Sequence, residues 1–203
     1  LRLWLRALVY WRATAYLADF FQAPEQRAWL EAMPQILEKP HRPYLQAGLS
    51  SMERAALVRS HYEITEASAQ QGLWRAAATA APAGGCPLAF WSGRSGQTYA
   101  LHLGSCDGLP KEGELVLSLS GGEMPAYRLA FTLGVREGLR VAYIGCLQGP
   151  SGPQMRELVR QATWDLQGER PRDLLLAMAQ ELFERMQVRT VLEPGLPAVF
   201  CDR

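Results

Sequence analysis

The spacing of hydrophobic residues divides the chain into a first third with a helical pattern and a later part with alternating positions. Four prolines cut the helical part into short pieces: Pro24, Pro34, Pro40 and Pro43. Ser50 and Glu53 have the spacing of a capping box, in which each side chain bonds the other's backbone amide. They predict a helix to about Ser60. Residues 72–86 are rich in alanine and glycine and are predicted to be a connection.

Strict alternation of apolar and less apolar residues predicts a series of strands from residue 88 onward. The segment 88–91 is a short apolar strand, and 141–144 is apolar on both faces, as expected of a central strand. Three segments between them place large apolar residues at every second position: 99–103, 115–119 and 127–133. Short turns that contain glycine separate these strands, so the pattern predicts a five-stranded antiparallel meander.

Two helices are predicted after the meander. Ser151 and Gln154 form a second capping-box pattern, and Gly168 is placed to end that helix. Pro171 is placed to begin the next helix. The predicted buried face of that helix consists of Leu174, Leu175, Met178, Leu182 and Met186. A last strand is expected at 188–192.

These elements together predict an α+β fold. It has a helical N-terminal third, an antiparallel meander sheet and two C-terminal helices on the sheet. We expect residues 1–72 to be a helical region packed on the core. Residues 73–203 should hold the sheet and its helices, and the two regions should act as a single functional unit.

Charge and cysteine content exclude some classes of function. The 203 residues include 21 Lys+Arg and 20 Asp+Glu, and a net charge of +1 gives no general attraction to nucleic acid. The cysteines are Cys86, Cys106, Cys146 and Cys201, with no C-x-x-C pair and no paired histidine ligands. We therefore expect reduced thiols and no metal site.

The first 21 residues are apolar but contain four charged side chains: Arg2, Arg6, Arg12 and Asp19. A spanning helix needs about 20 largely uncharged residues, and a signal peptide needs an unbroken apolar run. We expect a cytoplasmic protein whose N-terminal helix packs on its own domain. An interfacial helix, and with it association with a membrane surface, is the alternative. The chain starts at Leu1, so its native start is expected to be missing.

The best candidate for a ligand site is the strand-to-helix junction at 145–152. Glycines let a ligand approach the backbone, and free amides at a helix start attract anions. Gln148, Gly149, Ser151 and Gly152 would then hold a phosphate or pyrophosphate. The alternative is a tight Gly-Pro turn that binds nothing.

His61 and Tyr62 are the candidates for proton transfer. His61 is expected to follow the predicted helix, where it could act as a general base. The alternative is a histidine that only caps the last carbonyls of that helix. A solvated rim is predicted for the acidic residues of the turns: Asp107, Glu112, Glu114, Glu123 and Glu137.

Several segments in this order resemble the VirK/YbjX family of bacterial proteins, a family of unknown function. They include Ser60-His61-Tyr62, the run from Tyr143 through Leu147-Gln148-Gly149-Pro150, and Arg170-Pro171-Arg172-Asp173-Leu174-Leu175-Leu176. The resemblance covers about residues 1–192 and implies a Gram-negative bacterium, with links to virulence and to resistance against cationic antimicrobial peptides. Past residue 192 the sequence departs from the family pattern, so a divergent or truncated end is expected.

The predicted order of elements also looks like the acyl-CoA N-acyltransferase fold. In that fold the junction amides hold the cofactor pyrophosphate, which places Gln148, Gly149 and Gly152 at that position here. The spacing from Gln148 to Gly152 is one residue longer than the usual signature of the fold. Fold analogy alone does not establish function.

Two functions remain open from the sequence. The first is an acyl-CoA-dependent acyltransferase that acts on an envelope component or peptide, with His61 or Tyr62 moving protons. The second is a non-catalytic accessory protein that binds a membrane surface or an envelope partner. Nucleic acid is not an expected partner of either.

Overall fold

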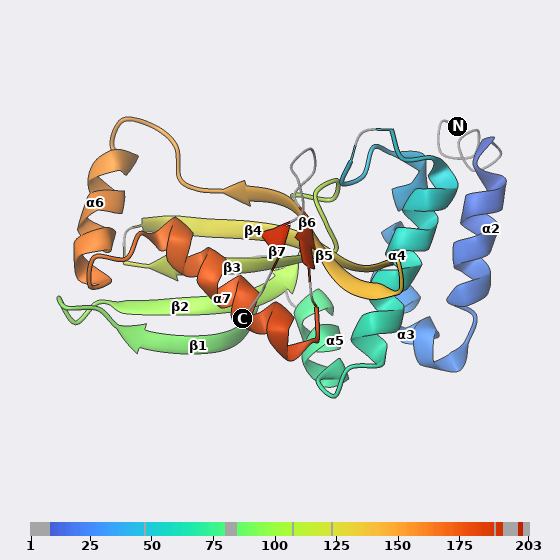
Figure 1. Ribbon diagram of the computed structural model, residues 1–203, viewed down its shortest axis with the longest axis horizontal. Coiled ribbons are helices and arrows are strands. Elements are labelled where there is room, and N and C mark those ends of the chain that lie inside the picture. Colours follow the sequence, from blue (N-terminus) through green and yellow to red (C-terminus); the bar gives the residue numbers. More distant parts are fainter. Residues whose placement is uncertain are drawn as a thin grey trace.

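The described strands form one seven-stranded sheet in the order β1 to β7 (Figure 1). The computed structural model describes residues 9–46, 48–79, 85–106, 108–122, 124–188, 190–192 and 199–200. The first five strands form the predicted antiparallel meander: β1 (Cys86–Ser92), β2 (Thr98–Ser105), β3 (Leu115–Gly121), β4 (Met124–Arg136) and β5 (Leu139–Gln148). The predicted last strand is β6 (Thr190–Leu192), which runs parallel to β5, and β7 (Val199–Phe200) follows it.

The N-terminal helices gather at one end of the sheet, and α6 lies at the other end (Figure 1). The elements of the N-terminal part are α2 (Trp11–Phe20), α3 (Pro24–Ala32), the 3-10 helix η1 (Pro34–His41), α4 (Ser51–Glu66) and α5 (Gln71–Thr79). The C-terminal helices are α6 (Met155–Asp165) and α7 (Pro171–Arg185). The α+β class is confirmed. Arg2 and Arg6, at the start of the predicted N-terminal helix, lie outside the described residues.

The capping box at the start of α4 is confirmed. The Ser50 hydroxyl accepts from the Glu53 amide at 3.2 Å, and the Glu53 carboxylate accepts from the Ser50 amide at 2.7 Å. The helix continues to Glu66, past the predicted end. The connection predicted at 72–86 is wrong in its first half, because Trp74 has its indole buried and anchors helix α5 to the core.

The capping box predicted at Ser151 is wrong. Helix α6 begins at Met155, and the preceding Gln154 makes no side-chain cap. The cause is Gly152, whose φ of +115° lies outside the helical region, so the chain turns there instead of starting a helix.

Helix α7 lies across one face of the sheet and begins at Pro171 as predicted (Figure 1). Its buried positions are four residues apart, at Leu175, Ala179 and Phe183. The Phe183 ring packs edge-on against Phe131 of β4, with centroids 5.0 Å apart. Over much of the helix, the buried residues therefore lie one position further along the chain than the predicted ones. Leu175 and Met186 are buried, but three predicted core residues are half-buried: Leu174, Met178 and Leu182.

The described part of the chain contains no helix with the length and apolarity needed to cross a bilayer. Within the same residues, no three His, Cys, Asp or Glu side chains gather into a group that could hold a metal ion. Cys86, Cys106 and Cys146 are free thiols.

Candidate functional site

His61 lies inside α4 and does not follow that helix. Its side chain is 1% exposed, and Nδ1 accepts a hydrogen bond from the Leu133 amide at 3.1 Å. Strand β4 continues beyond its last pairing with β3 at Leu115, so the imidazole takes the place of a neighbouring strand. Burial lowers the pKa of His61 to about 4, so the ring is a neutral acceptor at pH 7.

Tyr62 belongs to a closed polar cluster around Glu114. The Tyr62 hydroxyl donates to Oε2 of Glu114 at 2.8 Å, and the Tyr44 hydroxyl donates to Oε1 at 2.5 Å. Lys39 Nζ lies 2.6 Å from the same Oε1, and Thr132 is bonded to the Tyr44 hydroxyl at 2.7 Å. Glu114 is 4% exposed, so its prediction as part of a solvated rim is wrong.

The charges of this cluster balance inside the protein. Burial opposes ionisation of Glu114, but the charge of Lys39, the nearby His61 and the hydrogen bonds from Lys39 and Tyr44 together hold its pKa below the ordinary value. Burial, and after it the Glu114 charge, raises the pKa of both Tyr44 and Tyr62 well above the ordinary value. The two phenols therefore stay protonated as donors. The cluster is a satisfied structural network that ties the N-terminal helices to the sheet.

The other predicted rim residues differ in their surroundings. Glu137 is exposed, as expected, and Glu112 is half-buried, with a side chain that accepts from the Lys111 amide at 3.1 Å. Asp107 and Glu123 lie outside the described residues.

The predicted junction residues lie at the end of β5 and in the loop that follows it. Gln148 is exposed and pairs with Arg128 of β4. Gly149 packs so closely against the Tyr127 ring that a Cβ there would overlap it. Ser151 and Gly152 are exposed in the loop. The structure brings Gln148 and Gly149 together, but it sets Ser151 and Gly152 in a turn ahead of the helix.

Among the described residues, the second half of β5 has a strand partner on one side only, and we call residues 144–148 the open edge of β5. Strand β6 pairs with β5 only from Val141 to Tyr143. Beyond Tyr143, no described strand pairs with the side of β5 that faces away from β4, and this stretch borders the sheet in Figure 1. The register with β4 shifts at Gly145, which has no partner, and the backbone of Glu112 lies where a Cβ of Gly145 would be. Within the described part of the chain, residues 144–148 are therefore a bulged strand that has no strand partner on one side.

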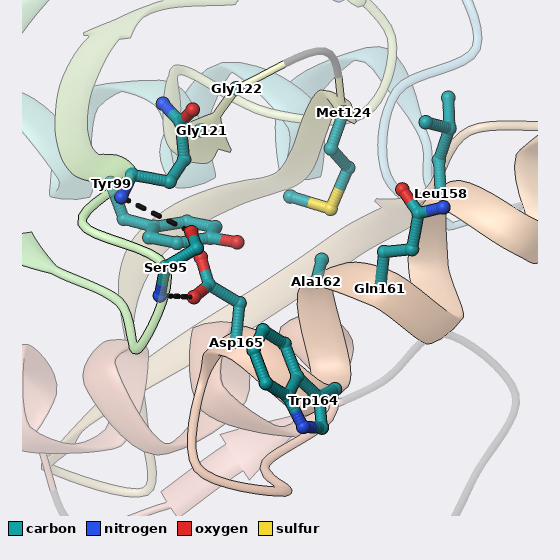
Figure 2. A pocket seen from close by; sticks show the side chains of 11 residues that line it. Ser95, Tyr99, Gly121, Gly122, Met124, Leu158, Gln161, Ala162, Trp164 and Asp165 are labelled. Atoms are coloured by element: carbon teal, nitrogen blue, oxygen red, sulfur yellow. Dashed lines mark hydrogen bonds between the residues drawn. The ribbon is translucent and has the colours of Figure 1, made fainter.

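A pocket of about 430 Å³ lies between α6 and two turns of the sheet (Figure 2). We call it the α6 pocket. It is defined by Gln97, Tyr99, Met124, Leu158, Gln161 and Asp165. Figure 2 shows Tyr99 and Asp165 on one side, with Met124 and Gln161 across from them. Its volume is within the range of small-molecule sites.

Asp165 holds this pocket together. Its Oδ1 accepts from the Ser95 amide at 2.6 Å, and its carbonyl accepts from the Arg94 amide at 3.0 Å. Gly93 is required beside it, because a Cβ would overlap the carboxylate. The Ser95 amide bond is the main cause that lowers the pKa of Asp165, and burial with the Asp165 contact raises the pKa of Tyr99 to about 12. The pocket therefore presents a carboxylate, a protonated phenol and two carboxamides, and none of its lining side chains is basic.

Sequence reasoning did not predict this pocket. Its turns at 93–96 and 121–122 were predicted correctly as turns. The signal that they meet α6 was absent, because the contact between Ser95 and Asp165 joins residues 70 positions apart.

Comparison with known proteins gives a family and a relative. The family model described as "Protein of unknown function (DUF535)" matches residues 1–193. The chain is 26% identical over 190 residues to "Uncharacterized protein YbjX" of Escherichia coli (strain K12). That alignment covers 93% of this chain and 57% of the relative, so the chain spans little more than half of the relative's length. No solved structure matches.

Proposed function

We propose that this chain is an acyl-CoA-dependent N-acyltransferase. It belongs to the family described as "Protein of unknown function (DUF535)". The resemblance to the VirK/YbjX family is confirmed by this match and by the YbjX relative. The observation that carries the proposed activity is the open edge of β5 over residues 144–148.

An open strand edge suits the pantetheine arm of coenzyme A. That arm is a narrow, extended chain with two amide groups, and extended amides pair with unpaired strand edges by main-chain hydrogen bonds. The fit to this chain rests on the bulge at Gly145 and on the outer side of 144–148, where no strand of the described residues pairs with β5. When bound, the cofactor would supply an acyl group as a thioester.

The loop after β5 would bind the phosphates. Gln148, Gly149, Ser151 and Gly152 remain the proposed contacts, now through loop amides and without a helix dipole. Positive charge lies close by. Arg128 lies opposite Gln148 in the pairing of β4 with β5. The Tyr127 ring packs on Gly149. Burial raises the pKa of Tyr127, and the positive charge of Arg172 acts against that rise. Such a site is screened by salt.

The α6 pocket would hold the acceptor amine, part of an envelope component or peptide. Asp165 would attract the ammonium form, and the Tyr99 hydroxyl, which bonds to Asp165, would hold that carboxylate in place. Attack of the neutral amine nitrogen on the acyl carbon forms the amide bond and breaks the C–S bond, and the proton lost by nitrogen leaves with the thiol or to water. His61 and Tyr62 have no part in this scheme, because both are 1% exposed and bonded within the core.

The burial of His61 and Tyr62 favours a second candidate function. A protein with no accessible histidine at its candidate site would bind a ligand or an envelope partner without turnover. This candidate is the accessory protein, and it includes the link to virulence and peptide resistance that the family resemblance implies. The two candidates share the same binding surface and differ in chemistry.

Thermal unfolding with matched cofactor fragments tests the proposal. Coenzyme A at 100 times its dissociation constant should add about 2.7 kcal/mol to the stability. Pantetheine should give a smaller stabilisation, and Arg172→Gln should weaken the effect of coenzyme A but not that of pantetheine. Arg12→Gln, an exposed arginine of α2, is the matched control. Thiol release from acetyl-CoA with added amines separates the enzyme from the accessory protein. An unchanged melting temperature at millimolar coenzyme A contradicts both steps of the proposed binding.

A further inference from the structure

A second cavity, of about 510 Å³, lies between α5, α7 and the strands β1 and β2. We call it the α5–α7 cavity. Its walls are formed mainly by Leu73, Trp74, Leu88, Leu101, Met178 and Leu182. It lies at the β1 edge of the sheet, whereas the open edge of β5 is four strand positions away in the sheet order. The cavity is therefore separate from the proposed acyl-carrier site.

The walls of the cavity are mainly apolar, and the polar residues among those that line it are Gln70, Glu181 and Arg185. Trp74 and Met186 reach it from the core and are only 1% and 4% exposed. The indole nitrogen of Trp74, its single polar side-chain atom, donates to the Ser68 hydroxyl at 3.2 Å and leaves the hydrocarbon part of the ring for the wall. The leucine, methionine and tryptophan surfaces of the walls offer no hydrogen bonds to ordered water.

The cavity explains the half-buried face of α7. Met178 and Leu182 follow the helical spacing of core residues, yet both are only partly covered. Both side chains line the cavity. Among the described residues, no other side chain covers their outer surfaces completely. Leucine and methionine side chains adapt to a flexible apolar guest.

Charged groups stand only at the mouth of the cavity. Arg185 donates from Nε to Glu181 at 2.9 Å, and both side chains are well exposed, at 73% and 61%. Among the described residues, Glu181 is the side chain with which Arg185 forms an ion pair, through Nε, and the guanidinium has further donors at its Nη atoms. The arrangement has a mainly apolar interior and, at the entrance, the ion pair of Arg185 with Glu181, in which the guanidinium keeps its Nη donors for a further acceptor.

We propose that the α5–α7 cavity binds the aliphatic chain of a fatty acid, with the carboxylate at Arg185. Each methylene group buried adds about 0.8 kcal/mol of transfer free energy, so affinity should rise with chain length until the cavity is filled. Arg185 holds the head group in a charge-assisted hydrogen bond at the mouth. The cavity takes one chain, which favours a free fatty acid over a two-chain lipid.

Calorimetric titration with dodecanoate, below its micelle concentration, tests the proposal. Wild type should bind dodecanoate more tightly than octanoate. Ala177→Phe, which fills the cavity from α7, should weaken binding by about tenfold or more. Ala76→Phe, an exposed alanine of α5 that does not line the cavity, is the matched control and should bind as wild type does. Ala89→Phe fills the cavity from β1 and replaces Ala177→Phe if that variant does not fold.

Two further arms identify the head group and the source of the chain. Arg185→Gln should weaken dodecanoate and leave 1-dodecanol unchanged. Binding of lauroyl lysophosphatidylcholine as tight as that of dodecanoate would assign the chain to a lipid and overturn the free-acid assignment. Equal dodecanoate affinity in wild type and both filled variants would overturn the site itself. Ala177→Phe should leave stabilisation by coenzyme A unchanged, so this result stands apart from the proposed acyl transfer.

Discussion

The hydroxyl of Tyr62 donates to the buried carboxylate of Glu114 at 2.8 Å, across a sequence separation of 52 residues. This bond joins the middle of α4 to the start of β3. With Lys39 and Tyr44 on the other carboxylate oxygen, it holds the N-terminal helices against the sheet. Tyr62, which was predicted from the sequence as a candidate for proton transfer, thus makes a structural contact in the core.

Glu114→Gln is expected to destabilise the protein strongly. The change leaves the Lys39 ammonium, whose side chain is 12% exposed, without its counter-charge, and breaking a buried pair costs about 3–5 kcal/mol. Glu63→Gln breaks the exposed pair with Arg59 and should cost less than about 1 kcal/mol. Urea unfolding at pH 7 measures both. Similar small losses for the two variants would contradict a charged, buried Glu114.

His61 should make stability depend on pH between about 4 and 6.5. The unfolded histidine takes up a proton as the pH falls through 6.5, whereas the folded one resists to about 4, so stability is lost on acidification. The full loss over this window is about 3 kcal/mol at 1.36 kcal/mol per unit.

His61→Asn is the matched variant for that pH dependence. The asparagine carbonyl can accept from the Leu133 amide but does not titrate. Its unfolding free energy should change less than that of wild type from pH 6.5 to 4.5. Identical pH profiles for the two proteins would show that folding does not lower the pKa of His61.

Phe183→Ala should cost about 3–5 kcal/mol, because it empties a fully buried site against Phe131. Leu182→Ala should cost less than about 2 kcal/mol, since Leu182 is half-buried and faces the α5–α7 cavity. Thermal unfolding of the two neighbours compares the faces of α7 directly. A larger loss for Leu182→Ala would restore the face predicted from sequence.

Gly93→Ala should destabilise by about 1–3 kcal/mol, because the new methyl overlaps the Asp165 carboxylate. Gly72→Ala is the matched control. It meets nothing within 4 Å and lies in helix α5, where alanine is favoured by up to about 1 kcal/mol. Calorimetric unfolding gives both values, and the Ser95 amide resonance reports whether the Asp165 contact is lost.

Local sequence signals predicted the elements of the fold well. The capping box at Ser50, the alternation in β2 to β4 and Pro171 at the start of α7 act over a few residues, and each formed where expected. Gly152 shows the limit of such signals, since its positive φ moved the helix start from Ser151 to Met155. Helix α5 was missed because its packing depends on Trp74 more than on its alanine-rich sequence.

The candidate site depended on contacts that no local pattern contains. The burial of Glu114 and the bond of His61 to strand β4 depend on partners 52 or more residues away. The open edge of β5 depends on strand pairing far along the chain: among the described residues, β6 pairs with β5 from Val141 to Tyr143 and no strand pairs beyond that point on the same side. The glycines at the end of an apolar strand led to the prediction of a site around Gln148, and β5 does end at that residue; the site itself stays a prediction.

Amide hydrogen exchange across residues 144–148, with and without coenzyme A, tests the proposed acyl-carrier site most directly. If the pantetheine arm pairs with the open edge of β5, the outward-facing amides of this stretch should exchange about tenfold or more slowly with the cofactor bound. Amides of the β2–β3 pairing, such as that of Leu117, are already bonded and should not change. Protection at 144–148 is the result we predict. Unchanged exchange at 144–148 under saturating coenzyme A would contradict the account.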